Sequence, residues 1–270
     1  MDRAEGGDWF VEWIGLAGLD VDKEAFLRSH GRETRTLSRN YSRLLKNPGE
    51  DEIHDARTAT RRAEALIELM PRHHRKSSDL DERYHKVMEK TAAVRDMDVL
   101  LTKLSGPEGS RRLVRAAEKT RRKAVGAVRE AVTSAGAVAL PSLSHEDVRS
   151  ARLQRRFEKV AGRLAEDVER RLPRVIADPS DAKDLHKLRI DIKKLRYLVG
   201  AVAPANPSPA SRLESMQDAL GSIHDWDVCI AYVSKLDPAW DVLPAWEAER
   251  EREFRGFARE YGGRHPGSKR

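Results

Sequence analysis

Two segments of the chain carry a histidine followed by cations at the same spacing. The first reads EIHDARTATRRAEALIELM from Glu52, and the second reads LHKLRIDIKKLRYLVG from Leu185. The cations are Arg57, Arg61 and Arg62 after His54, and Arg189, Lys193, Lys194 and Arg196 after His186. Arginine pairs with two phosphate oxygens through its planar guanidinium, and lysine supplies a movable point charge. Both segments therefore predict binding of an anion.

Both segments have the apolar period of an amphipathic helix, which advances by about 100° per residue. In the second segment the histidine and most of the cations share one stripe. The opposite, apolar stripe contains Leu188, Ile192, Leu195 and Val199. The first segment has one cation fewer, because Glu64 stands at the position that corresponds to Arg196. A repeated spacing of this kind indicates an internal duplication.

Longer rows of cations occur on three other helical segments. They are Arg28, Arg32, Arg35, Arg39 and Lys46; Arg152, Arg156, Lys159, Arg163 and Arg170; and Arg111, Arg115, Arg122 and Arg129. Each member of the second row lies 124 positions after its counterpart in the first. Like charges at such spacings repel by a few tenths of a kcal/mol, so we expect an anionic ligand to relieve the repulsion within each row. We expect the carboxylates to lie mostly on other faces of these helices.

If the rows of facing helices converge, they form a cationic groove that suits an extended polyanion better than a single phosphate. Neither a GxxxxGK[ST] loop nor a GxGxxG turn is present to bind a nucleotide. The row residues that we expect as secondary contributors to the groove are Arg28, Arg32, Arg35, Arg39, Arg111, Arg115, Arg122, Arg152, Arg156, Lys159 and Arg163.

Prolines separate the periodic segments, and no stretch alternates apolar and polar residues in the manner of a strand. We predict an all-α protein with helices near 24–46, 50–70, 78–104, 109–136, 146–172, 181–202, 210–236 and 240–261. Pro173 and Pro244 are expected to interrupt or start helices instead of separating them. Short connections and the duplication predict two pseudo-symmetric, up-and-down four-helix bundles. The expected divisions are an N-terminal extension at 1–23, a first half at 24–140, a second half at 145–262 and a basic tail at 263–270.

The bulk composition limits the class of protein. Lys and Arg number 51 against 44 Asp and Glu, and this net charge of +7 favours anionic partners. The single cysteine, Cys229, excludes a disulfide framework and a thiolate metal site. The acidic N-terminus is unlike a signal peptide, and no apolar run is long enough to span a membrane. We expect a soluble cytoplasmic protein.

Two phrases, VRDMDVLLTKL and IHDWDVCIAYVSKL, carry paired aspartates. Asp96 and Asp98, like Asp225 and Asp227, are two residues apart and so point about 160° from one another on a helix. One ion cannot easily bind both members of a pair. We expect one aspartate of each pair to cap or brace a basic neighbour and the other to face solvent.

Three alternatives stay open, and the first is a purely structural bundle in which the cationic rows make only intramolecular ion pairs. The dipeptides His54–Asp55 and His224–Asp225 are typical of metal-dependent phosphohydrolases, but the spacing of His73, His74 and His85 predicts no specific centre. A helical nucleic-acid-binding protein would need aromatic residues among the cations, and aromatics make up 6% of the chain. We predict no catalytic residue, metal or cofactor.

The phrases HDARTATRR, HKLRIDIKKLRY, RDMDV and HDWDV resemble the conserved histidine α-helical domain (CHAD) family, from about Ala25 to Tyr261. The resemblance implies duplicated helical bundles with a basic central channel that binds inorganic polyphosphate, and association with polyphosphate granules. It places at the ligand His54, Arg57, Arg61, Arg62, His186, Arg189, Lys193, Lys194 and Arg196. The segment with Trp9 and Trp13 lies outside the motifs, and we expect a small packing element there.

Overall fold

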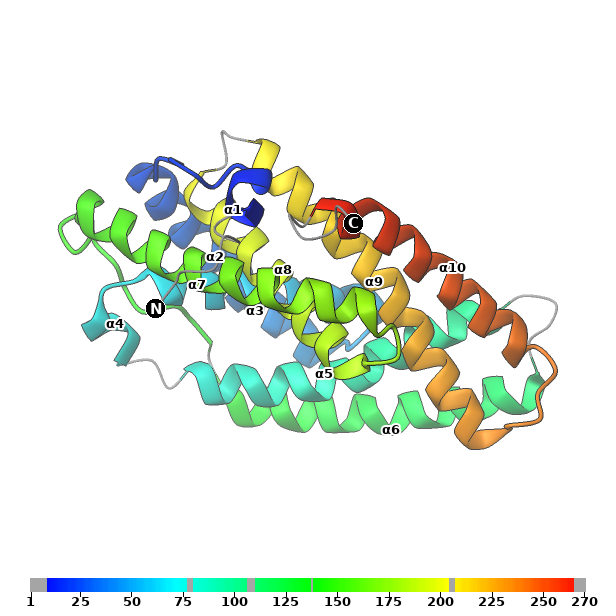
Figure 1. Cartoon of the computed structure of the whole chain (residues 1–270). Coiled ribbons are helices and arrows are strands. Elements are labelled where there is room, and N and C mark those ends of the chain that lie inside the picture. Colours follow the sequence, from blue (N-terminus) through cyan, green and yellow to red (C-terminus); the bar gives the residue numbers. More distant parts are fainter. Residues whose placement is uncertain (1–8, 77–79, 106–109, 137, 204–206, 265–270) are drawn as a thin grey trace. The chain divides into compact units, whose positions relative to one another are not determined.

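The computed structural model describes residues 9–76, 80–105, 110–136, 138–203 and 207–264 (Figure 1). Every regular element in these residues is a helix, and none of them forms a strand, which confirms the predicted all-α class. None of the helices in this part of the chain is both long and apolar enough to cross a membrane. The first residues of the expected helices at 78 and 109, the extension at 1–8 and the tail at 265–270 lie outside the described residues.

The elements are α1 (Trp9–Ile14), α2 (Lys23–Lys46), α3 (Glu50–Leu69), α4 (Arg72–Lys76), α5 (Leu80–Leu104), α6 (Arg111–Ala135), α7 (Ser150–Ala177), α8 (Ala182–Val202), α9 (Pro207–Leu236), α10 (Leu243–Tyr261) and the short 3-10 helix η1 (Gly262–Arg264). They belong to two compact units. Unit 1 contains residues 1–22, 150–227 and 244–270, and unit 2 contains residues 23–149 and 228–243.

Four long helices of unit 2 pack in a closed cycle. Helix α2 packs on α3, α3 on α5, α5 on α6, and α6 on α2; Figure 1 shows α5 and α6 side by side. Phe26 and Leu37 of α2 and Ile53 and Leu66 of α3 are at most 1% exposed. Burying one such side chain contributes about 1.5–3 kcal/mol. These apolar stripes hold the helices together and leave the opposite faces for charged residues.

Unit 1 is built on α7, which packs on α8 and carries α1 on its surface. Phe10 and Ile14 of α1 are fully buried, and the Phe10 N–H donates to Glu169 Oε1 at 2.8 Å. The Trp13 ring meets Tyr261 of α10 at 5.8 Å between centroids. The N-terminal tryptophan segment thus packs on unit 1.

Local signals set several helix ends. The Asp181 carboxylate accepts hydrogen bonds from the N–H groups of Lys183 and Asp184 and so caps the start of α8. Helix α6 ends at Ala135, and the following Gly136 has a φ of 66°, a positive value that glycine adopts without a steric penalty.

The predicted helix end at residue 172, directly before Pro173, is wrong. Helix α7 continues through Pro173 to Ala177, five residues beyond the expected end. Proline removes one backbone hydrogen bond, but Leu172 and Val175 on either side are at most 1% exposed. The packing of this apolar stripe therefore outweighs the local tendency of proline to end a helix.

His30 of α2 is 7% exposed, and its Nε2 lies 3.0 Å from the Pro141 carbonyl oxygen, to which the neutral ring can donate. Burial lowers the pKa of His30, the bond to Pro141 opposes this, and nearby His74 lowers it further. Because the folded-state pKa is depressed, the neutral ring contributes stability above the unfolded pKa of about 6.5, and that contribution is lost as the pH falls below it.

We therefore expect the free energy of unfolding to decrease between pH 7.5 and 5.5, and to decrease less in His30→Gln. Urea denaturation of both proteins with a chelator present measures the difference. His85→Gln, which changes an exposed histidine of α5, is the matched control. An identical pH dependence in His30→Gln and the wild type would contradict the assignment.

Candidate anion-binding site

Arg57 lies on the side of α3 that faces α5. Its Nη1 donates to the Met88 carbonyl oxygen at 2.7 Å and to Thr91 Oγ1 at 3.0 Å, and Thr91 is fully buried. The sequence predicted Arg57 at the ligand, whereas the structure shows that one nitrogen of its guanidinium also fastens α3 to α5. A mutation at Arg57 would therefore affect packing as well as charge.

Arg62 lies on the opposite side of α3, toward α2. Its Nη1 is 3.9 Å from Glu33 Oε2, and Arg32 Nε donates to Glu33 Oε1 at 3.0 Å. The Glu33 side chain is 3% exposed. One buried carboxylate of α2 thus holds cations of two helices, which places the rows of α2 and α3 next to one another. This role of Glu33 was not predicted from the sequence. The sequence does carry a signal for it, because Glu33 is an acidic residue that lies between Arg32 and Arg35.

His54 and Arg61 lie between these two sides on the helical wheel of α3. We call the following group the α2–α3 cationic face: Arg28, Arg32, Arg35, Arg39, His54, Arg61 and Arg62. His54, Arg35 and Arg39 are exposed, and Arg61 is half-buried. Within the part of the chain that the structure describes, Arg35, Arg39 and Arg61 carry no ion pair. Unit 2 therefore presents uncompensated positive charge on two packed helices.

Unit 1 has a comparable arrangement on α7 and α8. Arg171 of α7 pairs with Asp191 of α8, an ion pair between two packed helices. Burial raises the pKa of Asp191, and the Arg171 charge opposes that rise. We call the following group the α7–α8 cationic face: Arg152, Arg156, Lys159, Arg163, His186, Lys193 and Lys194. Arg152, Lys159, Arg163 and Lys194 are exposed and, among the described residues, form no ion pair.

The other side of α8 faces α9. Arg196 pairs with Glu214 and its guanidinium lies 5.1 Å from the centre of the Tyr197 ring. The His186 ring is 5.7 Å from the His224 ring, so the histidine of the second segment lies next to the histidine of IHDWDV. Arg189 is half-buried.

The expectation that carboxylates lie away from the cationic rows is wrong at several positions. Arg32, Arg62 and Arg196 have the partners given above, Arg122 lies 3.9 Å from Glu118 one turn earlier on α6, and Arg170 pairs with Asp167. These carboxylates come from neighbouring turns of the same helix or from a facing helix. A helical wheel that shows only the cations of one row does not include them. Arg111 and Arg115 are exposed on α6, which packs on α2 and α5.

One aspartate of each pair forms the expected brace, whereas the other, Asp96 or Asp225, is half-buried instead of facing solvent. Asp98 Oδ1 accepts from Arg121 Nε at 2.5 Å in unit 2, and Asp227 Oδ1 accepts from Arg250 Nε at 2.8 Å in unit 1. Both pairs join residues 23 positions apart. Arg250 Nη2 also donates to the Pro179 carbonyl oxygen at 2.8 Å. One aspartate of each phrase therefore ties its helix to the next long helix, α6 or α10.

Comparisons with known proteins agree with this helical architecture. A family model described as the CHAD domain matches residues 31–234, which is most of the chain and includes both histidine segments and both aspartate pairs. The crystal structure of the CHAD domain from the plant Ricinus communis is similar, with a TM-score of 0.54, 18% identity, and coverage of 90% of each chain; at this identity the likeness shows the fold alone. No curated protein matches the chain. On the evidence of the family model and the motifs it covers, this chain belongs to the CHAD domain family.

Proposed function

We propose that this chain binds inorganic polyphosphate through the α2–α3 and α7–α8 cationic faces and catalyses no reaction on it. One observation carries the proposal. Each unit presents exposed arginine or lysine side chains, on packed helices, that form no ion pair among the described residues: Arg35 and Arg39 on α2, Arg152, Lys159 and Arg163 on α7, and Lys194 on α8.

A linear polyanion complements such faces for a physical reason. Neighbouring cations on one helix repel one another, and an anion that runs along the row relieves that repulsion. Guanidinium groups on rigid helices bind phosphate oxygens with little loss of backbone entropy, and they stay charged at every physiological pH. The binding of successive phosphates also releases counterions, which adds a large salt-dependent contribution.

Two further observations support the proposal. The histidine motifs of the CHAD family lie on α3 and α8, and the resemblance that they carry implies polyphosphate as the ligand and association with polyphosphate granules. The two ion pairs with a common separation of 23 positions, one in each unit, support an origin by internal duplication. A duplicated chain would present two cationic faces to the same class of ligand.

The alternatives are less well supported. A single-stranded nucleic acid needs exposed aromatic platforms among the cations, whereas Tyr197 is half-buried beside Arg196. A phosphohydrolase would use His54 and Asp55 as metal ligands, but Asp55 Oδ2 accepts a hydrogen bond from Arg43 Nη1. In the described residues neither His–Asp dipeptide belongs to a three-residue group of close metal-ligand atoms.

Calorimetric titration with polyphosphates of graded length, at two salt concentrations, tests the proposal. If about six phosphates are neutralised, we expect the affinity to fall by about a thousandfold between roughly 50 and roughly 200 mM salt. Single-stranded RNA should compete weakly. Absence of binding at the lower salt concentration would overturn the proposal, and phosphate release stimulated by a divalent ion would favour the phosphohydrolase alternative.

A further inference from the structure

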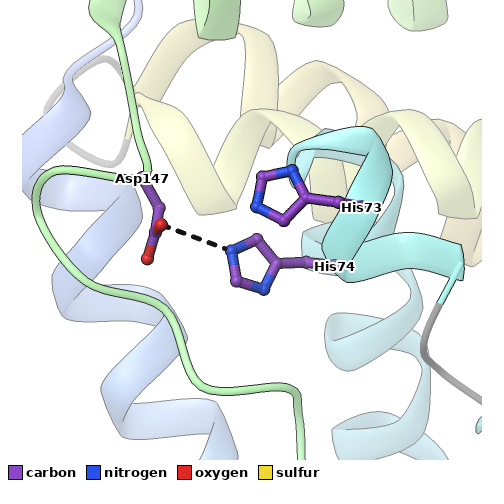
Figure 2. A group of neighbouring side chains, drawn as sticks. All are labelled: His73, His74 and Asp147. Atoms are coloured by element: carbon purple, nitrogen blue, oxygen red, sulfur yellow. Dashed lines mark ion pairs between the residues drawn. The ribbon is translucent and has the colours of Figure 1, made fainter.

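Two histidines of the short helix α4 lie against an aspartate that is far away in the sequence. His74 Nε2 is 3.6 Å from Asp147 Oδ1, and the His73 and His74 rings are 4.2 Å apart between centroids. One possible ligand atom of each of the three residues lies within 4.8 Å of those of the other two. Figure 2 shows both imidazoles on the side of α4 that faces Asp147. All three residues belong to unit 2.

Asp147 is held in place by its own loop. Its Oδ2 accepts hydrogen bonds from both the N–H and the hydroxyl of Ser144, each at 2.7 Å. These bonds engage Oδ2, while Oδ1 is the oxygen that faces His74. Carboxylates that bind metals are commonly oriented in this way by a second hydrogen bond.

A simple ion pair between His74 and Asp147 accounts for only part of this arrangement. It does not require His73, whose ring lies on the same side although adjacent helical residues ordinarily diverge by about 100°. Two neutral imidazoles and one carboxylate carry a net charge of −1, which a divalent cation neutralises. The three side chains thus have both the atom types and the charge of a metal site.

We propose that His73, His74 and Asp147 bind a divalent transition-metal ion, with Zn²⁺ the best suited. Imidazole nitrogen and carboxylate oxygen are ligands that Zn²⁺ prefers, whereas Mg²⁺ and Ca²⁺ favour oxygen alone. Atoms that share one ion at about 2.1 Å lie at most about 4.2 Å apart. The group must therefore contract slightly, and the exposed side chain of His73 can rotate to do so.

The ion would have a structural role. It would join α4 to the loop at 138–149, which immediately precedes α7 in the chain. The same loop contributes the Pro141 carbonyl oxygen that contacts His30. Binding of Zn²⁺ would add a second fixed point between this loop and the helices of unit 2. The site shares no residue with either cationic face, so it does not depend on the function proposed above.

Calorimetric titration of the untagged, chelator-treated full chain with Zn²⁺ alone tests the site. We expect one ion per chain. His74→Gln and Asp147→Asn should each lower the affinity by about tenfold or more, and Ser144→Ala by about tenfold because Asp147 loses one of its two anchors. His145→Gln is the matched control, since His145 is on the same loop but contacts Lys23 and Glu24 instead.

Two readouts make the result decisive. The visible absorption of bound Co²⁺ should show nitrogen and oxygen coordination in the wild type and disappear in His74→Gln, while circular dichroism checks that the variants are folded. Polyphosphate titration of the same variants should be unchanged. Equal Zn²⁺ affinity in the wild type and Asp147→Asn, or an equal loss in His145→Gln, would overturn the site and leave the polyphosphate proposal intact.

Discussion

Replacing Arg61 and Lys194 together with glutamine is expected to lower the affinity for polyphosphate by about a hundredfold at low salt. Each residue is a cation without an ion pair among the described residues, one on each cationic face. A charge-assisted hydrogen bond contributes about 1.5–3 kcal/mol, and each 1.4 kcal/mol is about tenfold in affinity. We therefore expect about a tenfold loss for each single variant. The slope of log affinity against log salt should decrease by about 1 for each cation removed.

The matched control is Arg149→Gln combined with Arg259→Gln. These residues are exposed, lie one in each unit and outside both faces, and their removal changes the net charge equally. Arg57 is a poor choice for this experiment because it also fastens α3 to α5. Unchanged affinity in the double variant would contradict the proposed faces.

Asp98→Ala is expected to reduce the free energy of unfolding by about 3–5 kcal/mol. The Asp98 side chain is 4% exposed and pairs with Arg121, which is 26% exposed. Removing one partner of a buried pair leaves the other charge desolvated and uncompensated, and that is the main cost. Asp227→Ala should cost less, because the Asp227 side chain is 25% exposed and Arg250 keeps its hydrogen bond to Pro179. Urea denaturation of the variants measures both values.

Glu50→Ala provides the control for this comparison. It breaks the ion pair between Glu50 and Arg95, whose side chains are 54% and 37% exposed. Exposed pairs of this kind contribute below about 1 kcal/mol. Should Asp98→Ala prove no more destabilising than Glu50→Ala, the aspartate phrases would not brace the helices, and their presence in both units would need another explanation.

Much of the fold was predictable because the helical signals are local. The apolar stripes of α3 and α8, with their charged faces, follow from residue spacing alone, and most helix ends fell within a few residues of the predicted ones. Helices α1 and α4 were not predicted, since six and five residues carry too little periodicity. Pro173 misled the prediction because the local preference of proline was weighed without the packing of Leu172 and Val175.

The residue types of the candidate site could be predicted from the sequence, but the ion-pair and hydrogen-bond partners of its cations could not. The cationic rows of α2 and α7 could be identified from spacing. That Glu33 holds Arg32 and Arg62, or that Arg57 bonds to the Met88 carbonyl oxygen, depends on which side of a neighbouring helix faces the row. Such partners come from other turns and other helices, and a single-helix pattern contains no information about them.

Residue order by itself determined the all-α class, the repeated histidine motifs and the presence of cationic faces. These properties follow from periodicities of 3.6 residues, which act within one helix. Tertiary structure alone decided which cations are neutralised, as Arg196 is by Glu214, and which form no ion pair among the described residues. It also brought Asp147 to His73 and His74 across more than seventy residues. Contacts over such separations are set by the packing of whole helices, because the side chains that meet share no local pattern.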